Sequence, residues 1–270
     1  MPNSIKATIR NTPLLGEGLV RLKRALLSSP PKPKFQFERE PITADEGNPV
    51  GQARNLLSYT KISGEVYAGC DYPAGYHTIE IEGEVLRGQR NPRSRLELVT
   101  YDFTGKSVLD VGSNQGGMLH AMDGKLSWGV GIDFDPRLVN AANRIARIRN
   151  DSTLAFYTFD LERDPLPLIE DFLPNRPDVI FLLAVCVWIS NWKQVVQFLS
   201  RLSDRMLFEA NGTQAQQATQ IALLRSIYRY VTVLAATSED DPSDKSRQLL
   251  WCEREYMRNG CRPEIRFAGT

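Results

Sequence analysis

Residues 108–117 read VLDVGSNQGG, an apolar run that passes directly into a turn rich in glycine. The run predicts a buried strand, and the residues after the turn predict a helix. Glycine suits the turn because the backbone bends sharply there, and because a ligand can approach a main chain that carries no side chain. Asp110, near the strand end, can accept hydrogen bonds from a cationic amino group or from turn amides. An ordinary strand-to-helix turn is the alternative.

The sequence that follows the turn indicates the fold class. From residue 106 onward, short Val/Ile/Leu/Phe runs alternate with stretches of helical period. This predicts an α/β fold with a doubly wound, Rossmann-like, mostly parallel seven-stranded sheet. The last two strands are joined by too short a segment for a helical crossover, so they should form an antiparallel C-terminal hairpin. We expect strands at residues 107–111, 128–133, 154–159, 179–185, 206–211, 230–235 and 248–252, and helices at 92–101, 117–125, 136–149, 192–202 and 214–228.

Composition excludes several classes of protein. A chain of 270 residues, 42% of them hydrophobic, can bury a full core, and no apolar run reaches the roughly 18 residues that cross a bilayer. The four cysteines form no C-x-x-C pair, so no metal site is expected. The formal net charge of +1 disfavours a polyanionic substrate. We therefore expect a soluble, cytoplasmic protein with no membrane span.

Acidic residues end two further predicted strands. Asp133, about 20 residues after the glycine turn, can bind ribose hydroxyls. Asp135 before Pro136 is typical of a helix N-cap. Phe134 could lie against an adenine ring or cover the sheet. Asp160 ends the third strand and, considered alone, is more typical of a loop or cap. Three carboxylates at successive strand ends nevertheless border the crevice where open parallel sheets bind ligands.

The spacing D-x-G-x-x-x-G, from Asp110 to Gly116, differs from the G-x-G-x-x-G of dinucleotide sites. It resembles motif I of the class I methyltransferases, and the resemblance spans residues 106–211. Asn114 stands where that family often has a glycine. The resemblance implies S-adenosylmethionine as cofactor, with an acid on the third strand accepting from the adenine amino group. It assigns residues 101–270 to the cofactor-binding methyltransferase domain and the cofactor contacts to Asp110, Gly112, Ser113, Asn114, Gly116, Asp133, Phe134, Asp160, Leu161 and Ala184.

Candidate catalytic and substrate residues lie outside the glycine turn. Trp188 could stack on a planar substrate, or it could be a core residue. Glu209 and Asn211 could remove or orient a proton, or they could cap the next helix. His77, preceded by Tyr76, is one of two histidines and suits general-base work on a hydroxyl, although a lone histidine is more often structural. We predict His77 and Glu209 as catalytic residues and the other three as substrate contacts.

Two segments precede the predicted sheet. Residues 1–40 are basic and end in a Pro-rich stretch, and leucines at helical spacing predict an amphipathic helix followed by a stiff linker. That helix either packs on the main domain or serves a membrane surface or organelle targeting. Residues 41–100, rich in Gly and Tyr, should form an N-terminal cap that acts as a substrate lid.

Methyl transfer needs few obligatory side chains, so the sequence indicates the cofactor more clearly than the acceptor. We expect transfer to an O or N nucleophile of a small-molecule or glycan-like acceptor. Residues 76–78, Tyr-His-Thr, are similar to wobble-uridine tRNA carboxymethyltransferase relatives. That similarity implies tRNA as the acceptor, contacted by the basic N-terminal segment, and a carboxylated S-adenosylmethionine as cofactor. A non-catalytic scaffold that keeps the cofactor fold is a third alternative.

Overall fold

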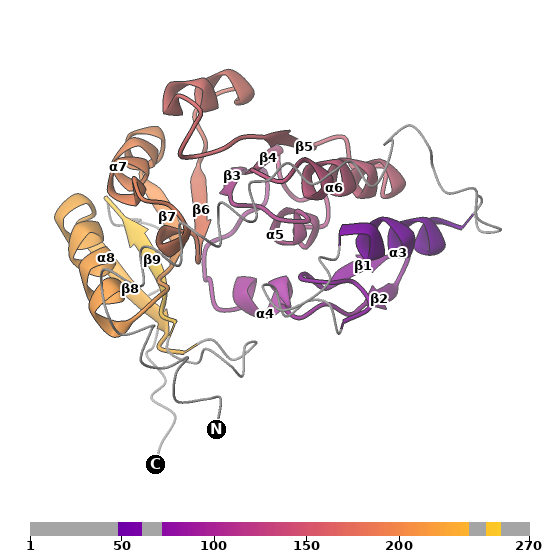
Figure 1. Ribbon diagram of the computed structural model, residues 1–270, viewed down its shortest axis with the longest axis horizontal. Helices are drawn as coiled ribbons and strands as arrows, with labels where there is room; N and C mark the ends of the chain where they lie inside the picture. The colour runs from indigo at the N-terminus through magenta and orange to yellow at the C-terminus, as the bar shows by residue number, and fades with distance from the viewer. Residues whose placement is uncertain (1–47, 61–71, 238–246, 255–270) are drawn as a thin grey trace, which may run out of the picture. The chain divides into compact units, whose positions relative to one another are not determined.

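The computed structural model describes residues 48–60, 72–237 and 247–254 (Figure 1). The helix and Pro-rich linker expected in residues 1–40 lie outside the described residues. None of the helices that the structure describes combines the length and apolar character needed to cross a bilayer.

A seven-stranded sheet forms the centre of the described structure, with the strand order β5-β4-β3-β6-β7-β9-β8 (Figure 1). The first five of these strands pair in parallel, and β9 pairs antiparallel with both β7 and β8. The mostly parallel sheet and the antiparallel C-terminal hairpin are therefore confirmed. The strands are β3 (Ser107–Val111), β4 (Trp128–Asp133), β5 (Leu154–Thr158), β6 (Val179–Leu183), β7 (Arg205–Glu209), β8 (Tyr230–Ala235) and β9 (Leu249–Glu253).

Helices cover both faces of the sheet, as a doubly wound fold requires. Neighbouring residues of one strand point to opposite faces. Accordingly Leu109 packs in one apolar cluster with Phe198 of α7, and Val108 packs in another with Val139 of α6. The helices after β3 are α5 (Gly117–His120), α6 (Pro136–Ile148), α7 (Trp192–Leu202) and α8 (Gln214–Ile227), with short 3-10 helices η2 (Leu166–Phe172) and η3 (Cys186–Trp188).

Two predicted helices are shorter in the structure. The helix expected at residues 117–125 is α5, which ends at His120 because Asp123 and Gly124 adopt left-handed φ angles of 53° and 70°. The helix expected at residues 92–101 is α4 (Pro92–Leu96). Strand β6 also ends two residues early, because Ala184 has a φ of 57°. Local hydrophobic period does not detect these left-handed residues.

The described part of residues 41–100, the predicted cap, packs on the sheet domain, with α3 (Pro49–Thr60) against α6 and α4 against α5. It consists of α3, the hairpin of β1 (Ile79–Ile81) and β2 (Glu84–Leu86), and α4. Leu57 of α3 and Ile79 of β1 are buried in one apolar cluster with Ile145 of α6. The Arg149 guanidinium donates a 3.0 Å hydrogen bond to the Glu80 carbonyl. The cap is thus anchored to the sheet domain by apolar and polar contacts.

Candidate active site

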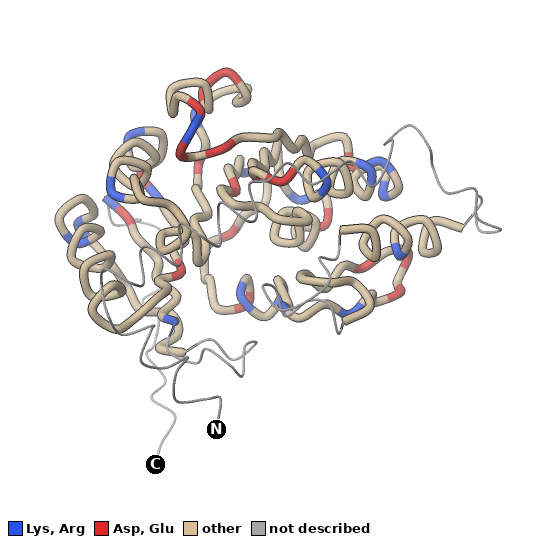
Figure 2. The backbone as a smooth tube through the Cα atoms, in the orientation of Figure 1, with Lys and Arg blue, Asp and Glu red and all other residues tan. Residues whose placement is uncertain are grey.

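Acidic residues gather at one edge of the sheet. Strands β3, β4, β6 and β7 are parallel, so their carboxyl ends lie at the same edge. Strand β6 contains no charged residue (Figure 2). By contrast, Asp133 and Glu209 are the last residues of β4 and β7, and Asp110 is the next-to-last residue of β3. All three are buried.

The glycine turn depends on backbone conformation and on close side-chain packing. Gly112 and Gly116 adopt left-handed φ angles of 78° and 73°. A Cβ on Gly112 would lie 2.6 Å from Cγ2 of Val185, and one on Gly116 would lie 2.5 Å from the Phe156 ring. The sharp bend expected from the sequence is confirmed. However, the space beside these glycines is filled by protein side chains.

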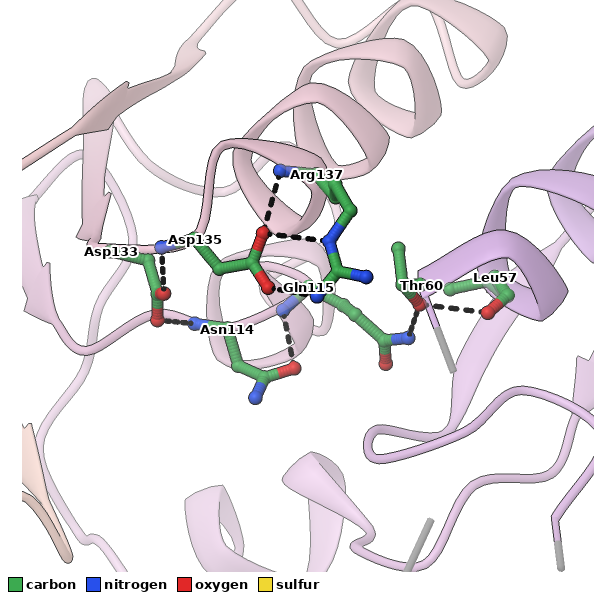
Figure 3. A network of polar contacts seen from close by, with 7 residues as sticks. All are labelled: Leu57, Thr60, Asn114, Gln115, Asp133, Asp135 and Arg137. Carbon is green, nitrogen blue, oxygen red and sulfur yellow. Dashed lines mark hydrogen bonds and ion pairs between the residues drawn. The ribbon is translucent and has the colours of Figure 1, made fainter. Parts of the chain in front are cut away.

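Asn114 adopts the left-handed conformation expected of a glycine, with a φ of 53°. Asparagine tolerates this region better than most residues. Its amide donates a 2.9 Å hydrogen bond to Oδ2 of Asp133, and its Oδ1 accepts one of 2.8 Å from the Gln115 amide (Figure 3). The turn therefore keeps its shape without the usual glycine.

The Asp133 carboxylate is held in place by backbone amides. Oδ2 accepts from Asn114, and Oδ1 accepts from the Asp135 amide at 3.0 Å (Figure 3). Burial raises the pKa of Asp133 to about 6, although these amide hydrogen bonds lower it in part. Asp135 itself caps α6, because its carboxylate accepts from the Arg137 amide, so the predicted N-cap is confirmed.

Asp110 is 2% exposed, and its Oδ2 has no hydrogen-bond partner among the residues that the structure describes. Burial, with the neighbouring charge of Asp133, raises the pKa of Asp110 to about 7, against the opposing effect of Arg95. The buried Oγ of Ser113 likewise has no partner within the described part of the chain. Buried polar atoms are nearly always hydrogen-bonded, so these two fit a polar ligand.

The other predicted cofactor residues differ in exposure. Phe134 is 47% exposed, so nearly half of its surface is open to solvent. Asp160 is half-buried, and its Oδ1 accepts from the Glu162 amide at 2.9 Å. The carbonyl of Leu161 accepts from the Asn191 side chain at 2.7 Å. The adenine contacts assigned to this strand end remain a prediction.

Asn211 supports the loop that follows β6. Its Nδ2 donates to the Ala184 carbonyl at 2.5 Å, and its Oδ1 accepts from the Val187 amide at 3.2 Å. The side chain is therefore engaged with backbone. Trp188, at the end of η3, is 37% exposed, so it is not a core tryptophan.

Glu209 lies between two arginines. Its Oε2 is 2.8 Å from Nη2 of Arg95, and its Oε1 is 3.7 Å from Nη1 of Arg247. Both carboxylate oxygens therefore face cations, which favours an electrostatic role for Glu209 over proton transfer. Sequence reasoning missed the two arginines because they are distant along the chain.

His77 is 4% exposed and lies against the start of α5. Its amide donates a 3.0 Å hydrogen bond to Oε1 of Gln115, and a Cβ on Gly117 would lie 2.5 Å from its Cγ. The Tyr76 ring is 4.8 Å from the imidazole, centroid to centroid. The structure thus brings His77 next to the glycine turn. No sequence pattern indicated that the Gln115 side chain would bind the His77 amide.

The second histidine belongs to the core. His120 is 1% exposed, and its ring centroid lies 5.4 Å from that of Phe156. Burial, together with the charge of Arg149, lowers the pKa of His120 to about 3, so the imidazole is neutral near pH 7. His120 therefore packs in the core against Phe156.

Comparisons with known proteins give the fold and the family of this chain. No curated protein matches the sequence. The solved structure of EvdMO1 has a TM-score of 0.53 and 13% identity, over 76% of this chain and 47% of that one. The N-terminal domain of EvdMO1 with SAH bound has a TM-score of 0.50 and 12% identity, over 80% and 99%. The bifunctional kinase-methyltransferase WbdD has a TM-score of 0.48 and 17% identity, over 62% and 40%.

The chain spans less than half the length of EvdMO1 and of WbdD. At these identities the likeness concerns the fold. The family model described as a methyltransferase domain matches residues 86–262, a range that includes the glycine turn, the acidic strand ends and the C-terminal hairpin. The chain therefore belongs to the class I S-adenosylmethionine-dependent methyltransferase family.

Proposed function

We propose that this chain binds S-adenosylmethionine at the carboxyl edge of β3 and β4 and methylates an O or N nucleophile of a small-molecule or glycan-like acceptor. The observation that carries the proposal is the buried Oδ2 of Asp110, which no described residue satisfies. A buried carboxylate of this kind is strongly stabilised by a cationic ligand group. The amino group of the cofactor's methionine moiety is such a group.

The residues of the turn fit the rest of the cofactor. Asp133, fixed by two backbone amides, keeps lone pairs that can accept from both ribose hydroxyls. The Ser113 hydroxyl, buried beside the turn, can bond another polar atom of the ligand. Phe134, largely exposed next to Asp133, is available to contact the adenine ring. We propose Asp160, Leu161 and Ala184 as further contacts.

The acceptor is proposed to lie between this edge and the cap. Tyr76 and His77 border the edge from the cap side, because His77 lies against Gly117. Trp188, partly exposed after β6, supplies a flat apolar surface. A structure of the N-terminal domain of EvdMO1 was determined in the presence of SAH and D-fucose, which supports a saccharide-like acceptor by analogy of fold.

When bound, the cofactor supplies an electrophilic methyl group. The chain's own task is to align the acceptor oxygen or nitrogen with that carbon and to exclude water. As the new C–O or C–N bond forms and the C–S bond breaks, the acceptor loses a proton. His77 would accept it, provided that its imidazole is neutral.

Calorimetric titration with S-adenosylhomocysteine tests the cofactor part of the proposal. Asp133→Asn should weaken binding by about tenfold or more, which corresponds to about 1.4 kcal/mol. Asp204→Asn is the matched control, because Asp204 lies on the surface in an ion pair with Arg176. Equal affinity in Asp133→Asn and wild type, or no binding by wild type, would contradict the proposal.

The alternatives make different predictions. The tRNA alternative depends on the basic residues 1–40, and binding of RNA should then weaken steeply with salt and with their deletion. A scaffold without activity should bind S-adenosylhomocysteine but methylate no acceptor. A screen with radiolabelled cofactor against saccharides, small metabolites and tRNA separates the three.

A further inference from the structure

Gln115 joins the glycine turn to two cap segments that precede it in the chain. The residue is only 2% exposed. Oε1 accepts the 3.0 Å hydrogen bond from the His77 amide, and Nε2 donates one of 2.5 Å to Oγ1 of Thr60 at the end of α3. Figure 3 shows the Gln115 side chain directed toward Thr60 and away from Asp133.

The directions of these hydrogen bonds are mutually consistent. The Thr60 hydroxyl donates to the Leu57 carbonyl at 2.7 Å, so its lone pairs remain for Gln115 (Figure 3). The side-chain oxygen of Gln115 accepts from the His77 amide, and its side-chain nitrogen donates to the Thr60 hydroxyl. Exchanging the positions of this oxygen and nitrogen would therefore lose hydrogen bonds. A buried, satisfied network of this kind holds its members in one arrangement.

His77 is confined on its other sides as well. A Cβ on Gly88 would lie 2.2 Å from the His77 carbonyl carbon, and one on Gly117 would lie 2.5 Å from its Cγ. Because glycine has no Cβ, both positions leave room for His77. The Gln115 hydrogen bond holds the backbone amide of His77, so a shift of Gln115 would displace the backbone that carries the imidazole.

The other end of the connection is the cofactor edge. The Gln115 amide donates to the side chain of Asn114, whose own amide donates to Asp133. A continuous series of hydrogen bonds thus runs from Asp133 through Asn114 and Gln115 to His77. Such a series can couple two sites when ligand binding changes the arrangement at one of them.

We propose that Gln115 is a positioning residue that transmits occupancy of the cofactor edge to the His77 imidazole. This inference rests on the proposed function, in which Asp133 binds the ribose and His77 accepts the acceptor's proton. A merely structural Gln115 would affect stability alone. A positioning Gln115 makes the environment of His77 depend on the cofactor.

The chain contains only two histidines, so imidazole NMR gives a simple readout. In protein with isotope-labelled histidine, His77→Asn identifies the His77 signal by its loss. Saturation with S-adenosylhomocysteine should shift that signal in wild type. Gln115→Met keeps the side-chain length but removes both hydrogen bonds, so it should still bind the ligand while losing most of the shift.

Thr60→Val is the matched control, because it removes the contact with α3 and keeps the bond between Gln115 and His77. It should retain the shift. If Gln115→Met does not fold, Gln115→Asn replaces it, since one fewer methylene prevents the amide from reaching both partners. The inference is overturned if wild type binds the ligand without a His77 shift, if the Gln115 variant keeps the full shift, or if Thr60→Val loses it equally. Absence of binding in wild type instead removes the proposed function, and this inference with it.

Discussion

At the scale of single residues, the proposed pairing of Asp110 with the amino group of the cofactor predicts how cofactor binding depends on pH. Burial raises its pKa to about 7, and that of Asp133 to about 6, so both carboxyls are largely protonated below about pH 5.5. A protonated Asp110 cannot pair with a cationic amino group. Affinity for S-adenosylhomocysteine should therefore rise as the pH increases from about 5.5 to about 8, by up to about tenfold per pH unit below the pKa.

Calorimetry across that pH range measures the effect. Asp110→Asn is the decisive comparison, because the amide cannot ionise and should bind more weakly with a much flatter pH profile. A wild-type profile that is flat, or that falls as the pH rises, would contradict the assigned role of Asp110.

Individual residues also show which contacts a sequence can reveal. The N-cap role of Asp135 was predictable, because Asp followed by Pro is a signal within one turn of helix. The arginines beside Glu209 were not, since Arg95 and Arg247 lie far from it along the chain. The link between Gln115 and His77 likewise spans 38 positions. Local pattern predicts caps and strand ends, but it does not predict side-chain partners across the fold.

At the scale of the element, the glycine turn should resist substitution for two separable reasons. Gly112→Ala imposes a left-handed alanine and a contact with Val185, and it should lower the free energy of unfolding by about 2–5 kcal/mol. Gly105 has a similar φ of 68°, but no atom lies within 4 Å of an added Cβ. Gly105→Ala should therefore lower the free energy of unfolding by only about 1–2 kcal/mol. Denaturant titration measures both.

The double variant Gly112→Ala, Val185→Ala separates crowding from backbone strain. Removing the Val185 methyl groups relieves the contact with the added Cβ, so the double variant should cost less than the sum of the two single changes. Simple additivity would show that crowding against Val185 is unimportant, and that conformation alone requires glycine in this turn.

The elements themselves were predictable to different degrees. The seven strands of the main sheet lie within two residues of the expected ranges, because runs of apolar β-formers mark buried parallel strands directly. Helices α4 and α5 are much shorter than expected; after α5, left-handed residues such as Asp123 end the regular conformation without changing the hydrophobic pattern. The position of β9 between β7 and β8 was not predicted, because strand order depends on contacts between distant segments.

At the scale of the whole molecule, Glu209 joins three parts of the chain: α4 of the cap, the end of β7 and the segment before β9. Glu209→Gln keeps the shape but removes the negative charge between the buried guanidinium of Arg95 and that of Arg247. Loss of one member of a buried ion network is strongly destabilising, so the free energy of unfolding should fall by about 3–5 kcal/mol.

The same variant separates the two roles considered for Glu209, because a general base and an electrostatic anchor respond differently to it. If Glu209 is an anchor, stability should fall and the pH profile of methyl transfer should keep its shape. Asp204→Asn, which weakens exposed ion pairs with Arg176 and Arg254, should change stability by less than about 1 kcal/mol. Unchanged stability of Glu209→Gln with abolished transfer would restore Glu209 as the base and make His77 a structural residue. The cap and the sheet would then depend on other contacts, chiefly the apolar cluster around Leu57 and Ile145, to stay together.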